Sequence, residues 1–319
     1  MADADYDPLA AGPHQVDVRT IEATDQARGR LFPIEIWSPA QSGLRPLIVF
    51  SHYSGGHRRT ATYLCTHLAS HGYVVAAMDH SEVVAPELAR RAGEAAAERA
   101  ARIDGIIASR VPDVRFLLDH LLAGGADIEI DASRIALVGH SFGGWTVLAT
   151  PEVELRVRSV VAMAPGGSSN PKSGILPLKL TFDWGRDVPT LYLAAENDVP
   201  IPLAGVYELF DRTPLSKRMF ILRRADHQHF IDDVEEAHEA VRAATFPPEA
   251  AWIPAAMRPI AELSSGEQAH MFVRGLTLAH FDATLRQMEV ADRFLSNDVE
   301  ADLAARGVEA FVKLDAPID

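Results

Sequence analysis

The sequence has a single cysteine and an excess of acidic over basic residues. Cys65 alone, in 319 residues, excludes an internal disulfide and a metal site built on several cysteine ligands. The 30 Lys and Arg residues face 44 Asp and Glu residues, which gives a formal net charge of −14. Nucleic acids and anionic membrane surfaces are bound through Lys and Arg, so we expect neither as a partner.

Long hydrophobic runs are also lacking. No stretch approaches the roughly 18 consecutive apolar residues of a membrane-spanning helix, so no transmembrane segment is expected. The first ten residues, MADADYDPLA, contain neither the basic region nor the apolar region of a secretory signal peptide. Together with the low cysteine content, this favours a cytoplasmic protein, or an exported one whose signal peptide has been removed.

Short apolar runs alternate with helical stretches along most of the chain. Residues 46–52 and 73–79 are continuous apolar runs, typical of strands buried on both faces, and an amphipathic stretch at 59–70 lies between them. Further strands are expected at 134–139, 159–163, 189–195 and 217–222. Strands that alternate with helices indicate an α/β protein with a mostly parallel sheet and helices on both faces.

Two segments interrupt this alternation. Residues 82–110 are rich in Ala, Arg and Glu, which are good helix formers, and we expect a helical insertion there. A second excursion, about 230–262, contains four prolines between positions 247 and 259 and is expected to be largely irregular. No internal repeat is present. The sequence therefore predicts one domain over residues 1–319 with two insertions.

A nucleophile motif lies at residues 139–143, GHSFG, which fits the pattern G-x-S-x-G. The motif follows an expected buried strand and precedes a helix-like stretch at 142–149. This strand–turn–helix context is the one required by a nucleophile elbow, where a tight turn exposes the serine hydroxyl and leaves space only for glycine at the flanking positions. The pattern predicts Ser141 as the nucleophile of an α/β-hydrolase fold.

A serine hydroxyl needs an adjacent base, and the base needs a third group to orient it. In this fold the chain order is serine, acid, histidine, and the later two should follow the ends of strands. Asp198 is favoured as the acid, with Glu196 as an alternative that lies earlier in the loop. His227 is favoured as the base because it is the first histidine beyond its strand, and His229 is the second candidate.

An oxyanion hole needs two backbone N–H groups that point at the developing negative charge. Phe142, which follows the nucleophile, is expected to provide one of them. The loop at 53–56, after the strand that ends at His52, is expected to provide the other. Its two glycines allow the backbone to bend close to a substrate.

At this point the sequence resembles a known group of enzymes. The run PLIVFSHYSGGHRRTATYLCTHLASHGYVVAAMDH resembles the oxyanion-loop region of platelet-activating-factor acetylhydrolases and of bacterial dienelactone-hydrolase-like esterases. The runs GHSFGG and DHQHFID resemble the nucleophile and histidine regions of the same group. The resemblance extends from about Arg28 to the final amphipathic helix. It implies a serine esterase that uses no cofactor and has Ser54 as the second oxyanion donor.

The sequence departs from this group at two places. The acetylhydrolases carry their acid after the strand that here continues as Ala-Pro-Gly-Gly, without a carboxylate. Asp198, one strand later, matches the dienelactone-hydrolase-like arrangement, so phospholipid specificity is not expected. Tyr53 stands where such enzymes usually have glycine. Either the loop differs, or the ring lines the acyl pocket, which Phe142 is expected to narrow further.

We therefore expect a carboxylic-ester hydrolase that acts on a small-molecule ester through an acyl-enzyme. Short acyl chains are favoured because of the segment that is best placed to cover the site, residues 85–110. This covering segment is rich in Ala, Arg and Glu rather than broadly apolar. An acyltransferase, an amidase, a lipase and a polyester hydrolase are alternatives on the same triad. A non-catalytic binding protein is disfavoured because the triad is complete. The sequence leaves a homo-oligomer open.

The thirteen histidines do not indicate a metal site. His67 and His71 are four residues apart, but on a helix that should face away from the triad, so we expect no metal. Asp79 and His80 follow a strand and are expected near the rim of the site, where they would help to shape it.

Overall fold

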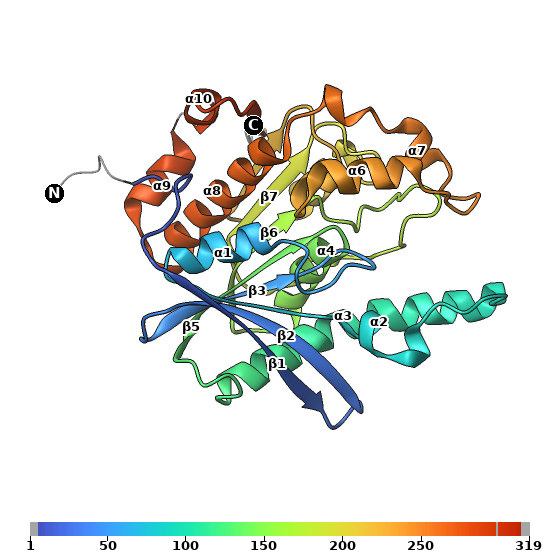
Figure 1. The fold of residues 1–319 in the computed structure, drawn as a ribbon, viewed down its shortest axis with the longest axis horizontal. Helices are drawn as coiled ribbons and strands as arrows, with labels where there is room; N and C mark the ends of the chain where they lie inside the picture. Colours follow the sequence, from blue (N-terminus) through green and yellow to red (C-terminus); the bar gives the residue numbers. More distant parts are fainter. Residues whose placement is uncertain (1–5, 298, 314–319) are drawn as a thin grey trace.

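The computed structural model describes residues 6–297 and 299–313. A central nine-stranded sheet has the order β1-β2-β4-β3-β5-β6-β7-β8-β9, with helices packed on both faces (Figure 1). This architecture confirms the predicted α/β fold with a mostly parallel sheet.

The elements have the following bounds. The strands are β1 (Val16–Asp25), β2 (Arg30–Pro39), β3 (Arg45–Ser51), β4 (Val74–Met78), β5 (Ile130–His140), β6 (Val157–Met163), β7 (Thr190–Ala195), β8 (Lys217–Leu222) and β9 (Ala310–Lys313). The helices are α1 (Thr62–Ser70), α2 (Ser81–Val84), η2 (Pro86–Leu88), α3 (Ala96–Leu122), α4 (Phe142–Ala149), η3 (Thr150–Glu152), α5 (Leu203–Arg212), η4 (His227–Phe230), α6 (Val234–Ala243), α7 (Trp252–Ala256), η5 (Ile260–Glu262), α8 (Gly266–Leu285), α9 (Glu289–Ser296) and α10 (Val299–Ala304).

The middle of the sheet is parallel and its edges are antiparallel. Strands β4, β3, β5, β6, β7 and β8 pair in parallel, whereas β1, β2 and β9 pair antiparallel with their neighbours. Strand β3 is buried along nearly its whole length and has a hydrophobic core on each face. Leu47 and Val49 contribute to one core and Ile48 and Phe50 to the other, as the alternation of side chains along a strand requires.

Different helices cover the two faces. Helices α1, α8 and α9 pack on the face that contains Ile48 and Phe50, and helices α3, α4 and α5 pack on the opposite face (Figure 1). The carboxyl ends of the parallel strands therefore meet at one edge of the sheet, between the two helix layers. This is the edge where ligand sites form in open α/β sheets.

The two segments that interrupt the alternation take the following form. Residues 82–110 comprise most of α2, the short η2, a loop and the first half of α3. Helix α3 continues without a break through Pro112 to Leu122, so it extends beyond the predicted end of the insertion at residue 110. The excursion around 230–262 contains α6 and α7 among its loops. In the part of the chain that the structure describes, no helix has both the length and the apolar character that crossing a membrane requires.

Candidate active site

Ser141 lies on a sharp turn between the end of β5 and the start of α4. Its backbone has φ 58° and ψ −112°, a strained conformation for a residue other than glycine. The glycines of the motif are required by close contacts. A Cβ atom on Gly143 would lie 1.9 Å from the carbonyl oxygen of Ser51, and one on Gly139 would lie 2.3 Å from that of Gly143. The sequence at this turn is therefore the one that a nucleophile elbow needs.

Asp198 and His227 are brought together from two neighbouring strands. Asp198 lies in the loop after β7, and His227 begins η4 after β8. The Nδ1 atom of His227 lies 2.8 Å from Oδ2 of Asp198, and the other carboxylate oxygen accepts a hydrogen bond from the backbone N–H of Ile201 at 2.7 Å. Both carboxylate oxygens are thus occupied, and the ring of His227 is held in one orientation.

The ring of His227 packs beside the nucleophile elbow. Its centre lies 4.6 Å from the ring centre of His140, the residue before Ser141. The elbow itself is anchored by hydrogen bonds from the Ser141 N–H to the Met163 carbonyl and from the Gly166 N–H to the Ser141 carbonyl. The serine, the histidine and the aspartate that the sequence singles out therefore gather at the same edge of the sheet.

Burial and pairing shift the pKa values of these groups. Burial alone would lower the pKa of His227, but the charge of Asp198 and the hydrogen bond to it outweigh burial and raise the pKa above its ordinary value. Burial raises the pKa of the Asp198 carboxyl, although the neighbouring His227 opposes that rise. His140 is fully buried, and this burial together with the nearby His227 holds its pKa well below its ordinary value. Of the two neighbouring histidines, His227 is therefore the one that binds a proton more readily.

The alternative acid and base have other partners. Glu196 accepts a hydrogen bond from the backbone N–H of Arg224 at 2.9 Å, so its carboxylate is held at the adjacent loop. His229 is completely buried, with Nδ1 accepting from the backbone N–H of Asp226 and Nε2 donating to the carbonyl of Ser264. These contacts give His229 the role of tying η4 to the excursion.

The two expected oxyanion donors are free to bind a ligand. Among the residues that the structure describes, no protein group accepts a hydrogen bond from the backbone N–H of Ser54 or of Phe142. Ser54 is exposed and lies in a turn that is closed by a hydrogen bond from the Gly56 N–H to the Tyr53 carbonyl at 3.0 Å. Both N–H groups are therefore available as donors, which the predicted oxyanion role requires.

The rings of Tyr53 and Phe142 are placed differently from one another. Tyr53 does not have a positive φ, so the loop accommodates a tyrosine without strain, and its half-buried ring packs against His140. Phe142 is 2 % exposed, and its ring stacks on Trp145. The ring of Phe142 is therefore part of the packed core, and only the backbone N–H of this residue is left for the predicted role in the site.

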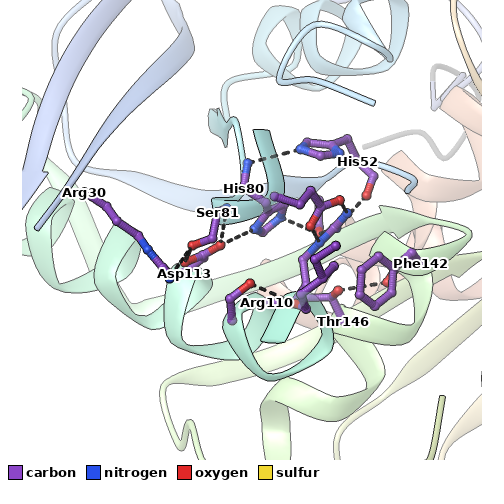
Figure 2. A network of polar contacts seen from close by, with 12 residues as sticks. Arg30, His52, His80, Ser81, Arg110, Asp113, Phe142 and Thr146 are labelled. Carbon is purple, nitrogen blue, oxygen red and sulfur yellow. Dashed lines mark hydrogen bonds and ion pairs between the residues drawn. The ribbon is translucent and has the colours of Figure 1, made fainter. Parts of the chain in front are cut away.

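A buried polar network lies directly behind the oxyanion loop (Figure 2). It contains Arg110, which is fully buried and contacts both the 53–56 loop and Phe142. Asp79 and His80, which were expected at the rim of the site, are buried in the same region. Arg110 could not be identified from the sequence, because an arginine in an Ala/Arg/Glu-rich helix ordinarily faces solvent.

The histidines that were considered for a metal site serve the fold. His67 and His71 hydrogen-bond through Nε2 to the carbonyls of Pro8 and Ala10, so they hold the N-terminal segment against α1. Within residues 6–297 and 299–313, no group of three or more His, Cys, Asp or Glu side chains is arranged to hold a metal ion.

Comparisons with known proteins place the chain among esterases. It is 25% identical over 237 residues to platelet-activating factor acetylhydrolase of Cavia porcellus, covering 61% of this chain and 50% of the relative. It is also 25% identical over 206 residues to cutinase est1 of Thermobifida alba, covering 62% of this chain and 58% of the relative. The predicted resemblance to acetylhydrolases is confirmed. The chain spans about half the length of the curated relatives that it matches.

A solved structure supports the fold over nearly the whole chain. The ferulic acid esterase of Streptomyces cinnamoneus superposes with a TM-score of 0.66 at 20% sequence identity, covering 96% of this chain and 99% of the esterase. At that identity the match speaks for the α/β-hydrolase fold alone. The sequence profile of the chlorophyllase family matches residues 6–185, which is more than half of the 319 residues. The protein therefore belongs to the chlorophyllase family of α/β hydrolases.

Proposed function

We propose that the protein is a carboxylic-ester hydrolase with Ser141 as nucleophile, His227 as general base and Asp198 as the orienting acid. The observation that carries the proposal is the strained Ser141 turn at the same sheet edge as a buried hydrogen bond of 2.8 Å between Asp198 and His227. Relatives named as an acetylhydrolase and a cutinase support ester bonds as the target.

Each group has a separate role in the proposed reaction. Nδ1 of His227 is committed to Asp198, so Nε2 is the atom that accepts the proton of the Ser141 hydroxyl. The serine oxygen then bonds to the ester carbonyl carbon, and the N–H groups of Phe142 and Ser54 stabilise the resulting oxyanion. His227 returns the proton to the leaving alcohol, and an acyl-enzyme remains. Water, activated by the same histidine, releases the acid and regenerates the serine.

A fluorophosphonate probe tests this assignment on the intact protein. We expect the probe to abolish ester hydrolysis in proportion to labelling and to modify the tryptic peptide 135–156, in which Ser141 is the single serine. Mass spectrometry of the digest identifies the labelled peptide. Stoichiometric labelling of any other peptide, or full labelling with activity retained, would place the reactive serine elsewhere. Acyltransferase activity on the same triad is distinguished by product analysis with and without an added alcohol.

The second prediction is a preference for short acyl chains. The large apolar side chains of the covering segment are turned into the protein, since Leu88 is buried and Ile106 and Ile107 pack against the core. The apolar residues of the excursion, including Trp252 and Met257, pack against one another in a small cluster of their own. Neither segment therefore presents the broad apolar surface through which a lipase binds to a lipid interface.

This preference is measured with a series of esters that differ only in acyl chain length. With p-nitrophenyl esters of two to sixteen carbons, we expect kcat/KM to be highest between two and six. A maximum at ten carbons or more, with activation above the micellar threshold, would instead indicate a lipase.

The third prediction concerns pH. Ester hydrolysis requires neutral His227, and because pairing with Asp198 raises its pKa, the ring retains its proton to a higher pH than free histidine. We therefore expect kcat/KM to rise with pH through one ionisation, with a midpoint above the ordinary value of about 6.5. Activity is lost as pH falls through that midpoint. A pH profile with several buffers, corrected for spontaneous hydrolysis, measures it, and a midpoint below six contradicts the assigned pairing.

The raised pKa of His227 also makes the stability of the folded protein depend on pH, in the opposite direction to activity. Because the folded-state pKa of His227 is raised, protonation at this site stabilises the folded protein fully below the unfolded pKa. That stabilisation is lost as pH rises through the folded pKa. Neutral His227, which the proposed reaction requires, is thus the form that lacks this stabilisation.

A further inference from the structure

Arg110 is a fully buried arginine in the middle of α3 whose N–H groups are directed at the oxyanion loop (Figure 2). Burying a guanidinium is unfavourable unless its donors are paired, and here they are. Its Nε and Nη2 atoms form a two-point ion pair with the carboxylate of Glu82. Nη1 donates to the His52 carbonyl at 2.7 Å and to Oγ of Ser51 at 3.3 Å, and Nη2 also donates to the Tyr53 carbonyl at 3.3 Å.

The two carbonyls that Arg110 holds belong to the peptide units that enter the oxyanion loop. In a trans peptide the C=O and N–H bonds point in opposite directions. The Tyr53 carbonyl shares its peptide unit with the N–H of Ser54, so holding this oxygen on the Arg110 side directs the Ser54 N–H away from Arg110. Hydrogen bonds to a carbonyl also polarise its peptide unit and strengthen the N–H as a donor.

Arg110 also contacts the residue that supplies the other oxyanion donor. The carbon at the centre of its guanidinium lies 4.1 Å from the centre of the Phe142 ring, within the range of a cation–π interaction. The carbonyl of Phe142 accepts a hydrogen bond from the Thr146 hydroxyl at 2.8 Å. One side chain therefore contacts both the Tyr53–Ser54 peptide unit, through its carbonyl oxygen, and the ring of Phe142.

The guanidinium is braced from behind by a chain of buried polar groups. The Ser51 hydroxyl, which accepts from Arg110, donates to Nε2 of His80 at 2.8 Å. Nδ1 of His80 lies 3.2 Å from the Asp113 carboxylate, which accepts two further hydrogen bonds from Ser81. Burial and the nearby Arg110 lower the pKa of His80, so its neutral ring can accept from Ser51 and donate to Asp113 at once.

We propose that Arg110 is a positioning residue of the oxyanion hole, which aligns the Ser54 and Phe142 N–H groups for the transition state without touching the substrate. This inference rests on the proposed ester hydrolysis and extends it to a residue outside the triad. Loss of one oxyanion donor typically lowers kcat about 10²- to 10³-fold. Misalignment of the Ser54 donor should therefore act on kcat, whereas KM depends mainly on ground-state contacts that Arg110 does not make.

The test removes the ion pair as a unit. In Glu82→Gln/Arg110→Met neither charge is left buried alone, and we expect kcat to fall about 100-fold with KM changed less than threefold. The inhibition constant of an aryl trifluoromethyl ketone, which forms a tetrahedral adduct on the serine, should rise by the same factor as kcat/KM falls. If the double variant does not fold, Arg110→Lys replaces it in the test. Lysine keeps the positive charge beside Glu82 but cannot donate to both carbonyls at once, so we expect kcat to fall about tenfold.

The matched control is a second arginine with the same three kinds of contact. Arg286 pairs with Asp282 at 2.8 Å, donates to the His71 carbonyl at 2.8 Å and lies 3.9 Å from the Tyr73 ring centre, far from the carboxyl ends of the strands. The double variant Asp282→Asn/Arg286→Met should lose stability comparably and keep kcat within threefold of the wild type. A purely structural role for Arg110 would make the two double variants behave alike.

A readout without substrate separates this inference from the proposed function. The Gly56 N–H donates to the Tyr53 carbonyl, so its hydrogen exchange should accelerate in the Arg110 variants and stay unchanged in the Arg286 control. If the wild type hydrolyses no ester through Ser141, the proposed function fails, and the exchange rates still decide whether Arg110 holds the loop. A folded Arg110 variant with kcat within threefold of the wild type, with an equal effect on KM, or with unchanged Gly56 exchange overturns the inference.

Discussion

Ser141→Ala should lower kcat for ester hydrolysis by about 10³-fold or more while the protein remains folded. The hydroxyl is the group that bonds to the carbonyl carbon, and the remaining residues cannot replace it. Its removal is structurally mild, because the Ser141 side chain is partly exposed and, among the described residues, donates to no protein acceptor. The strained backbone at φ 58° is unchanged, since alanine and serine differ by one oxygen.

Ser54→Ala is the matched control for this substitution. Ser54 is also an exposed serine at the site, but its proposed role is carried by its backbone N–H, which alanine retains. We expect this variant to keep kcat within threefold of the wild type. The measurements are steady-state hydrolysis of p-nitrophenyl butyrate and thermal unfolding for all three proteins. Ser141→Ala activity within tenfold of the wild type would assign the nucleophile to another residue.

Asp198→Asn should lower kcat by about 10⁴-fold, whereas Glu196→Gln should change it less than threefold. The Asp198 carboxylate accepts from Nδ1 of His227 at 2.8 Å, which leaves Nε2 free to accept the serine proton. An amide at that position can donate to Nδ1 instead and so hold the ring in the wrong tautomer. Glu196 is bonded to the backbone of Arg224 and has no contact with the histidine.

Steady-state rates of the two variants decide between the carboxylates, with thermal unfolding to show that both proteins are folded. Asp198→Asn preserves the size of the side chain and its bond from the Ile201 N–H, so the comparison isolates the charge and the tautomer. If Glu196→Gln were the more damaging change, the acid would lie two residues earlier than proposed.

The central strands could be predicted from the sequence because their burial is a local property. A strand covered by helices on both faces is apolar at nearly every position. Continuous apolar runs of this kind can be recognised in the sequence on both sides of β5. The strand expected at 217–222 coincides with β8 (Lys217–Leu222), and the apolar run at 73–79 contains β4 (Val74–Met78). The order of the strands in the sheet was not accessible, because it depends on contacts between distant segments.

The residues of the candidate triad could be found for a similar reason, since each follows a strand in a fixed order along the chain. Arg110 could not, because its burial arises only when α3 packs beneath the oxyanion loop. Nothing within several residues of Arg110 distinguishes it from Arg99 or Arg102, which lie in the same helix and pair with Glu249 and Glu94. The predicted end of the insertion at residue 110 is also not a boundary in the structure, because α3 continues through it to Leu122.

The chain contains two sets of serine, histidine and aspartate in which Nδ1 of the histidine faces the aspartate carboxylate. In the buried set, Ser51 donates to His80 and His80 faces Asp113, and none of the three is more than 1 % exposed. Ser141, by contrast, sits on a turn that carries its hydroxyl out of the core. In the proposed reaction, what separates Ser141 from Ser51 is therefore access to the substrate. The buried set has the groups for proton transfer, but a substrate carbonyl carbon cannot reach them because all three side chains are enclosed by the protein.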